Sequence, residues 1–328
     1  MATSRQIKEL INTHQSKDDE RFYTVALQIA AGETKKGHKQ VANELRNLIQ
    51  GAIESQKKPR SISTVDTIAK PQGDAANLLN VVHPRHSFSQ MVLPVVLKKK
   101  LDRIVLEQKQ FNLLKSNGLS PKQKILLLGP SGCGKTLTAE ALANELGMPL
   151  FVVRIDALFT RYLGETANKL PLIFEAIDQN RAVFLFDEFD SIGLERGSHN
   201  DIAEMRRVLN SFLVLIEEMN SNSVIIAASN HPEVFDKAIH RRFDDIIYYQ
   251  APSKDEIVTL FKNKLSEHKA QSLNWDSIAN EANGLNYEEI TIITEDILKD
   301  VLLEKISALS TKQLLDTIKE RKQIEIRP

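Results

Sequence analysis

Apolar residues recur at helical spacing through the first part of the chain, in stretches such as IKELI, FYTVALQIAA and VANELRNLIQGAI. This pattern predicts an N-terminal bundle of short helices over residues 1–55. A bundle of this size buries little surface by itself, so we expect it to pack on something else. It is either a packing appendage or an adaptor, because helical periodicity carries no information about partners.

Residues 56–87 lose this periodicity and predict a linker. The stretch QKKPRSISTVDTIAKPQGD is rich in Pro, Ser, Gly and charge, a composition typical of a segment that need not pack. The stretch LKKKLDRIVLEQKQFNLLKSNG is then amphipathic and ends at Gly118, which suits the left-handed conformation that follows a helix end. A larger domain is therefore expected from about residue 88.

Between residues 88 and 252, short apolar runs alternate with helical stretches. The runs are KILLL, LFVVRI, AVFLF, SVIIAAS and DIIYY. Strands that alternate with helices predict an α/β fold, in which helices cover both faces of a mostly parallel sheet to give three layers. Beyond residue 252 the helical spacing returns. The sequence thus predicts a helical C-terminal lid over residues 253–328.

Composition narrows the classes of function. Lys plus Arg and Asp plus Glu both total 43, so no overall basic excess points to nucleic acid or a membrane surface. No apolar run approaches the roughly 18 residues of a spanning helix, and the start MATSRQIKEL is polar rather than signal-like. The single cysteine, Cys133, is typical of a reducing compartment, so a cytoplasmic location is expected.

The stretch GPSGCGKT connects KILLL to a helical stretch and matches the phosphate-binding pattern G-x-x-x-x-G-K-[ST]. Glycines let backbone N–H groups turn around phosphate oxygens, and the following helix directs its positive dipole end to the same place. A plain glycine-rich turn would leave the lysine unexplained. We expect nucleotide contacts from the whole loop: Gly129, Pro130, Ser131, Gly132, Cys133, Gly134, Lys135 and Thr136.

Separate roles are expected within this motif and at a second one. Lys135 should reach the outer phosphates, the Thr136 hydroxyl should bind Mg²⁺, and Cys133 is either a reactive thiol or a small packing residue. In AVFLFDEFD, Asp187 and Glu188 end a buried strand, where two acids are costly without a cation. Asp187 is predicted to hold Mg²⁺, and Glu188 to orient or activate the attacking water. An acidic surface turn is the alternative.

With these motifs, the chain resembles the AAA family of ATPases, the group that includes katanin, spastin and the vacuolar sorting ATPase, from about residue 88 to 303. The stretch RYLGETANKLPLIF resembles that family's first pore loop, in which an aromatic, an aliphatic and a glycine point into the channel of a ring. The resemblance implies this role for Tyr162, Leu163 and Gly164. A packed tyrosine is the alternative.

Two further motifs carry the resemblance. IIAASN ends at Asn230, which by resemblance holds the lytic water or reads the γ-phosphate. FDKAIHRRFDD is similar to LDxAxxRRF of spastin-like members, so Arg241 and Arg242 would be arginine fingers that enter the neighbouring subunit's site and raise the rate by about 10³ to 10⁵. A surface basic pair bridging Asp244 or Asp245 is the alternative.

The stretch NGLNYEEITIITEDI resembles the family's lid helix but departs from its usual pattern. Members commonly carry Gly-Ala against the adenine, where Tyr287 and Glu288 stand here, and no arginine occupies a second sensor position in this stretch. Tyr287 either flanks the base or packs in the core. The adenine contacts therefore stay open.

The resemblance implies an ATPase that uses ATP and Mg²⁺, assembles with copies of itself into a ring, expected to be a hexamer, and remodels, unfolds or threads a polypeptide. Some bacterial stand-alone AAA ATPases look similar, and a few sit beside a subtilisin-like protease, so a separate protease is a candidate partner. The sequence has no H-E-x-x-H motif for a fused zinc protease. The alternatives are a DNA-associated AAA+ loader or helper, although no basic stripe is evident, and an ATP-gated scaffold.

Overall fold

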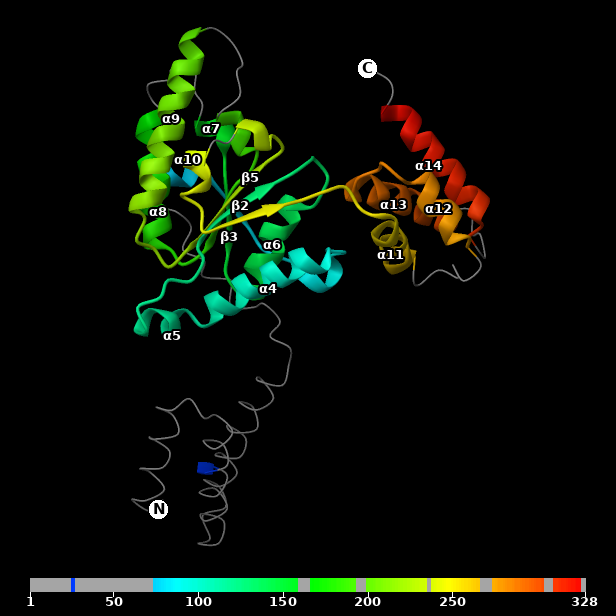
Figure 1. Cartoon of the computed structure of the whole chain (residues 1–328), viewed down its shortest axis with the longest axis horizontal. Coiled ribbons are helices and arrows are strands. Elements are labelled where there is room, and N and C mark those ends of the chain that lie inside the picture. Colours follow the sequence, from blue (N-terminus) through cyan, green and yellow to red (C-terminus); the bar gives the residue numbers. More distant parts are fainter. Residues whose placement is uncertain are drawn as a thin grey trace. The chain divides into compact units, whose positions relative to one another are not determined.

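The computed structural model describes residues 25–26, 73–158, 166–192, 199–234, 237–265, 273–303 and 309–325. The chain divides into two compact units, Met1–Thr67 and Ile68–Pro328, and the fold described below is that of the second unit (Figure 1). Apart from Val25 and Ala26, the predicted N-terminal bundle lies outside the described residues, as does the first part of the predicted linker.

A six-stranded sheet forms the centre of this unit, with strand order β1-β3-β4-β5-β2-β6. Strands β2 to β6 are parallel to one another, and β1 pairs antiparallel with β3. The sheet confirms the predicted α/β fold. The strands are β1 (Leu79–Val82), β2 (Lys124–Leu128), β3 (Leu150–Val153), β4 (Val183–Phe186), β5 (Val224–Ser229) and β6 (Asp245–Tyr248).

Strand β1 differs from the sequence prediction, which places its residues in the linker. It is short, it lies at the edge of the sheet, and Leu79 is its one fully buried residue. Its register pairs Leu79 with Val153 of β3. A strand that buries a single position has no alternating pattern to detect, so only the tertiary pairing with β3 defines it.

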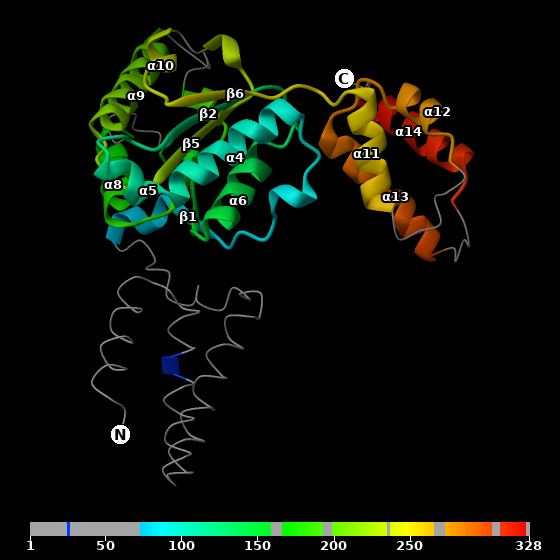
Figure 2. The same ribbon diagram turned by 60° about the horizontal axis from the view of Figure 1, so that its bottom comes forward.

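Helices cover both faces of the sheet, because successive residues of a strand point to opposite sides. Figure 2 shows α8 and α9 on one side of the sheet and α4 and α6 on the other. In β2, Leu126 and Leu128 pack in a core with α8 and α9, whereas Ile125 and Leu127 pack in a core with α4 and α6. The helices are α4 (Val95–Lys109), α5 (Phe111–Ser116), α6 (Lys135–Leu146), α7 (Ile155–Leu158), α8 (Thr166–Gln179), α9 (His199–Glu218) and α10 (Lys237–His240).

Among the described residues after β6, four helices pack around a core of their own (Figure 1). They are α11 (Lys254–Leu265), α12 (Trp275–Glu281), α13 (Tyr287–Leu303) and α14 (Thr311–Glu325). Phe261 of α11, Ile290 and Ile293 of α13 and Leu314 of α14 are buried in this core. Within the described part of the chain, no helix has both the length and the apolar content that crossing a membrane requires.

Candidate nucleotide site

The loop after β2 has a backbone that requires glycine. Gly129 and Gly132 have φ angles of 146° and 70°, in the region that L-residues rarely adopt. A Cβ atom would lie 2.4 Å from the Tyr249 carbonyl oxygen at Gly129, and 2.5 Å from the Asn286 side chain at Gly132. The loop is therefore held closely between the end of β6 on one side and the start of α13 on the other.

Lys135, the first residue of α6, places its ammonium group among neutral oxygens. Its side chain is buried, and its Nζ donates at 2.7 Å to the carbonyl oxygens of Gly129 and Pro130 and to Oδ1 of Asn230. Burial lowers the pKa of Lys135, against the opposing influence of nearby Asp187. A buried cation held only by neutral acceptors is suited to receive an anionic ligand.

Thr136 and Asp187 bring a hydroxyl and a carboxylate together. Thr136 lies in the first turn of α6, Asp187 directly follows β4, and the Thr136 Oγ1 donates to Asp187 Oδ2 at 2.6 Å. Mg²⁺ prefers such oxygen ligands and completes its shell with phosphates and water. Within the described residues, no group of three or more His, Cys, Asp or Glu side chains could hold a metal. With one hydroxyl and one carboxylate oxygen, the pair fits a cation that takes its other ligands from phosphate and water.

The turn after β4 is strained. Glu188 has φ of 50°, the one positive value among the described non-glycine residues, and its N–H donates to Asp187 Oδ1 at 2.9 Å. Such a conformation costs about 1–3 kcal/mol and persists only where the surrounding fold imposes it. Phe186 and Phe189 flank the turn, and their rings lie 5.0 and 4.6 Å from the ring of Phe212 in α9. These buried rings anchor both ends of the turn.

Asn230 links the loop after β2 to this acidic turn. It follows β5, which lies between β2 and β4 in the sheet. Its Oδ1 accepts from Lys135, and its backbone N–H donates to Oδ1 of Asp190 at 3.2 Å. Asp190 is buried and is the site residue that the sequence analysis missed. Its signal was present in DEFD, since an acid beside buried phenylalanines needs a specific partner.

These side chains line a cavity of about 560 Å³. The phosphate-binding loop, the acidic turn and Asn230 form one part of its wall, and Glu288, Thr291, Ile292 and Glu295 of α13 form another. The backbone N–H of Glu288 donates to the carbonyl oxygen of Gly132 at 3.2 Å. Helix α13 therefore begins directly on the loop, and the lid contributes to the same cavity.

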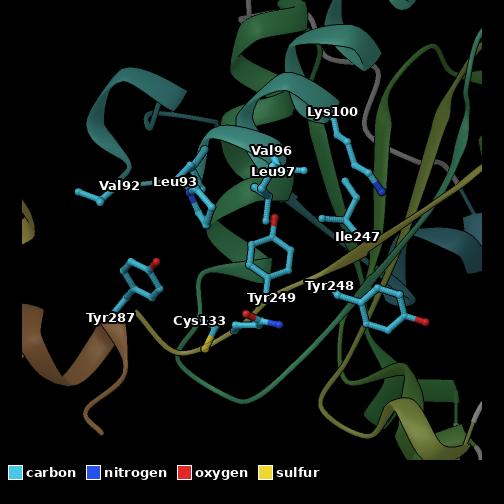
Figure 3. A pocket seen from close by; sticks show the side chains of 12 residues that line it. Val92, Leu93, Val96, Leu97, Lys100, Cys133, Ile247, Tyr248, Tyr249 and Tyr287 are labelled. Carbon is cyan, nitrogen blue, oxygen red and sulfur yellow. The ribbon is translucent and has the colours of Figure 1, made fainter. Parts of the chain in front are cut away.

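A second cavity has a volume of about 290 Å³, and Figure 3 shows the side chains that line it. Its lining is mostly apolar and aromatic and includes Val92, Leu93, Cys133 and Tyr249. Tyr287 of α13 lines both cavities. Such a lining suits the flat ring system of a nucleotide base.

Burial determines the ionisation of three groups here. It raises the pKa of the Tyr249 hydroxyl, which donates to Thr138 Oγ1 at 2.7 Å. It also raises the pKa of Tyr287, as does nearby Glu256. Burial likewise raises the pKa of the Cys133 thiol, which favours the packing alternative over a reactive thiolate.

Comparison with known proteins assigns the family. Residues 125–251 match the model of the ATPase family associated with various cellular activities (AAA). An uncharacterized AAA family ATPase, y4kL, of Sinorhizobium fredii (strain NBRC 101917 / NGR234) is 33% identical over 308 residues, which cover 93% of this chain and 91% of that protein. The chain belongs to the AAA family of ATPases. The predicted family is thereby confirmed, and membership implies ATP hydrolysis.

Two further relatives are similar to this AAA ATPase over smaller shares. A putative cell division cycle ATPase of Plasmodium falciparum (isolate 3D7) is 33% identical over 227 residues, or 66% of this chain and 18% of that protein. The crystal structure of the FIGL-1 AAA domain superposes with a TM-score of 0.58 and 21% identity, covering 75% of this chain and 86% of that domain. The latter likeness shows that the two share a fold.

Among the remaining predicted site residues of this AAA ATPase, Arg241 and Arg242 are not part of the lining of the first cavity. Arg241 and Arg242 follow α10, where Arg241 is exposed and the Nε of Arg242 donates to Glu217 Oε2 at 3.2 Å. Asp245, one of the proposed alternative partners, pairs with Lys122 at 2.6 Å. The predicted pore-loop residues Tyr162, Leu163 and Gly164 lie outside the described residues.

Proposed function

We propose that this chain hydrolyses ATP as the subunit of a ring that remodels, unfolds or threads a polypeptide. The observation that carries the hydrolytic part is the convergence of Lys135, the Thr136–Asp187 pair and Glu188 on one cavity. The loop amides and Lys135 would bind the phosphates, and Thr136 and Asp187 would hold Mg²⁺. The bound Mg²⁺ would neutralise charge on the phosphate oxygens.

Glu188 and Asn230 are proposed to act on the attacking water. The strained backbone of Glu188 holds its carboxylate at the cavity, where it can accept a proton from water or orient it. Asn230 is tied to both Lys135 and Asp190, so its amide is fixed relative to the phosphate-binding loop. The adenine base is proposed to occupy the second cavity, beside Tyr287 and Tyr249.

ATP turnover in the presence of Mg²⁺ tests the hydrolytic part. We expect Glu188→Gln to keep ATP binding while turnover falls by about 10²- to 10⁴-fold, the usual contribution of a general base. Glu218→Gln is the matched control, because Glu218 is an exposed glutamate near the end of α9. Wild-type turnover in Glu188→Gln would exclude this role for Glu188.

Assembly into a homo-oligomeric ring, proposed as a hexamer, would bring Arg241 and Arg242 to the nucleotide of the next subunit. The resemblance of HRRF to the spastin-like pattern supports this proposal. We expect the Arg241→Ala/Arg242→Ala variant and the Glu188→Gln variant each to be inactive alone, and their mixture to recover hydrolysis. In a mixed ring, some sites combine an intact Glu188 with intact arginines from the neighbour. A mixture without recovered activity would contradict action across the interface.

The polypeptide substrate is proposed from the pore-loop resemblance of Tyr162 and Leu163. We expect an unfolded polypeptide to stimulate ATP turnover, and Tyr162→Ala to abolish that stimulation without changing basal turnover. Stimulation by DNA instead would favour the loader or helper alternative. A Tyr162→Ala variant that keeps the full activity of the wild-type chain would favour the scaffold alternative.

A further inference from the structure

The cavity proposed for the phosphates is lined by more acidic than basic side chains. Asp187 and Glu188 belong to the acidic turn, and Glu288 and Glu295 reach the same cavity from α13. Among the described residues that line it, Lys135 is the one lysine or arginine. The acidic turn is accounted for by Mg²⁺ and water, as proposed above. The two lid carboxylates have no such role.

The lid carboxylates face the cavity because of the geometry of α13. Glu288, Thr291, Ile292 and Glu295 follow the spacing that places residues on one face of a helix. The opposite face, with Ile290 and Ile293, is buried in the lid core. The rotation of the helix is therefore fixed by its packing.

The position of α13 is also fixed, at its first turn. The Glu288 N–H donates to Gly132 at 3.2 Å. Asn286 and Glu289 cap each other, with the Asn286 N–H donating to Glu289 Oε2 at 2.8 Å and the Glu289 N–H donating to Asn286 Oδ1 at 2.9 Å. Glu289 is thus used for capping and is buried, whereas the side chains of Glu288 and Glu295 are exposed.

Charge then decides which nucleotide this face favours. A triphosphate carries more negative charge than a diphosphate, and its terminal phosphate lies beyond the group that both share. Glu288 and Glu295 line the same cavity as Lys135, and charges separated by less than a Debye length, about 8–10 Å at ordinary salt, repel without full screening. Lys299, one turn beyond Glu295, forms its ion pair with Asp296 at 2.8 Å, and its charge also acts on Glu295, so Glu295 is partly compensated by this lysine.

We propose that Glu288 and Glu295 are specificity-determining residues that lower the affinity of an isolated subunit for the triphosphate relative to the diphosphate. The inference rests on the proposed function and deepens it. Stable binding of the triphosphate then depends on positive charge from a second copy of the chain, such as its Arg241 and Arg242. Nucleotide exchange and assembly are coupled through the lid.

The test compares dissociation constants for Mg²⁺-ADP and for a slowly hydrolysed Mg²⁺-ATP analogue, at full-chain concentrations where sedimentation shows a monomer. We expect Glu288→Gln and Glu295→Gln each to tighten the triphosphate about two- to fivefold more than the diphosphate. Added salt should reduce this difference. Asp300→Asn, which changes an exposed acid of α13 outside the cavity lining, should leave the ratio of the two constants unchanged.

Glu295→Lys provides a second variant, and it should shift the ratio further in the same direction than Glu295→Gln. An unchanged ratio in all three glutamate variants, or an equal shift in Asp300→Asn, would overturn the inference while leaving the proposed function in place. A wild-type chain that binds neither nucleotide would overturn both. Circular dichroism of each variant separates a change of charge from a loss of fold.

Discussion

Gly132→Ala tests whether the lid rests directly on the phosphate-binding loop. Gly132 has φ of 70°, and a Cβ atom there would lie 2.5 Å from Cγ of Asn286. The same Asn286 side chain caps α13 by accepting from the Glu289 N–H at 2.9 Å. An added methyl group must therefore displace the capping side chain, and the strain at the loop is passed to the lid.

Two costs add in this variant. Alanine in the left-handed conformation costs about 1 kcal/mol, and loss of an asparagine cap costs about 1 kcal/mol more. We expect the free energy of unfolding to fall by about 2 kcal/mol. Gly118→Ala is the matched control, since Gly118 has φ of 72° and nothing lies within 4 Å of its Cβ position. Only the first cost applies there.

Urea unfolding followed by circular dichroism measures both variants, and the fluorescence of Trp275, the single tryptophan of the chain, reports on α12 of the lid. In an Asn286→Ala background the cap is already absent, so Gly132→Ala should cost only about 1 kcal/mol. The contact between loop and lid would be refuted if Gly132→Ala and Gly118→Ala lowered the free energy of unfolding equally, and if Gly132→Ala lowered it by the same amount in the Asn286→Ala background.

Three other changes follow from contacts at the site. Tyr249→Phe removes the hydrogen bond to Thr138 and should lower the free energy of unfolding, measured with urea, by about 1 kcal/mol. Tyr248→Phe is the control and should leave that free energy unchanged, because the Tyr248 ring is exposed. Asp190→Asn should lower kcat about tenfold in a steady-state ATPase assay with little change in KM, because it loosens Asn230. Burial raises the pKa of Glu140, but hydrogen bonds from Arg85 and His86 lower it more, so the folded-state pKa lies below its usual value. The Glu140 carboxylate therefore stabilises the fold fully at neutral pH, and this contribution is lost as pH falls through the lowered pKa. Thermal unfolding should therefore show that the difference in stability between wild type and Glu140→Gln disappears once the pH is below that pKa.

The sequence predicts the core of this molecule well because local and tertiary signals agree there. The runs KILLL, AVFLF and SVIIAAS are buried except at Lys124, and they form the adjacent strands β2, β4 and β5. Parallel strands bring their carboxyl ends to one edge, so Lys135, Asp187 and Asn230 meet although they lie far apart in the chain. The motifs alone therefore predict that these three residues lie close together.

Other features depend on contacts that no local pattern carries. Strand β1 exists only through its pairing with β3. The departure at Tyr287 and Glu288 is visible in the sequence, but the exposure of the α13 face to the phosphate cavity depends on the approach of Asn286 to Gly132. The acid at Asp190 is visible in the stretch DEFD, but its partner is not, because that partner is the backbone N–H of Asn230, which follows a different strand.

The hydroxyl of Tyr249 has a consequence for how the lid is joined to the sheet. Tyr249 is anchored to Thr138, which in turn donates to the carbonyl oxygen of Gly134 at 2.9 Å. Helix α11 begins at Lys254, so the free tether is limited to residues 250–253, and Pro252 within it has a fixed φ. Residues 250–253 are therefore too few and too restricted to act as a flexible linker. This segment acts as a restricted hinge whose base is fixed, through Tyr249 and Thr138, to α6, the helix that begins at Lys135.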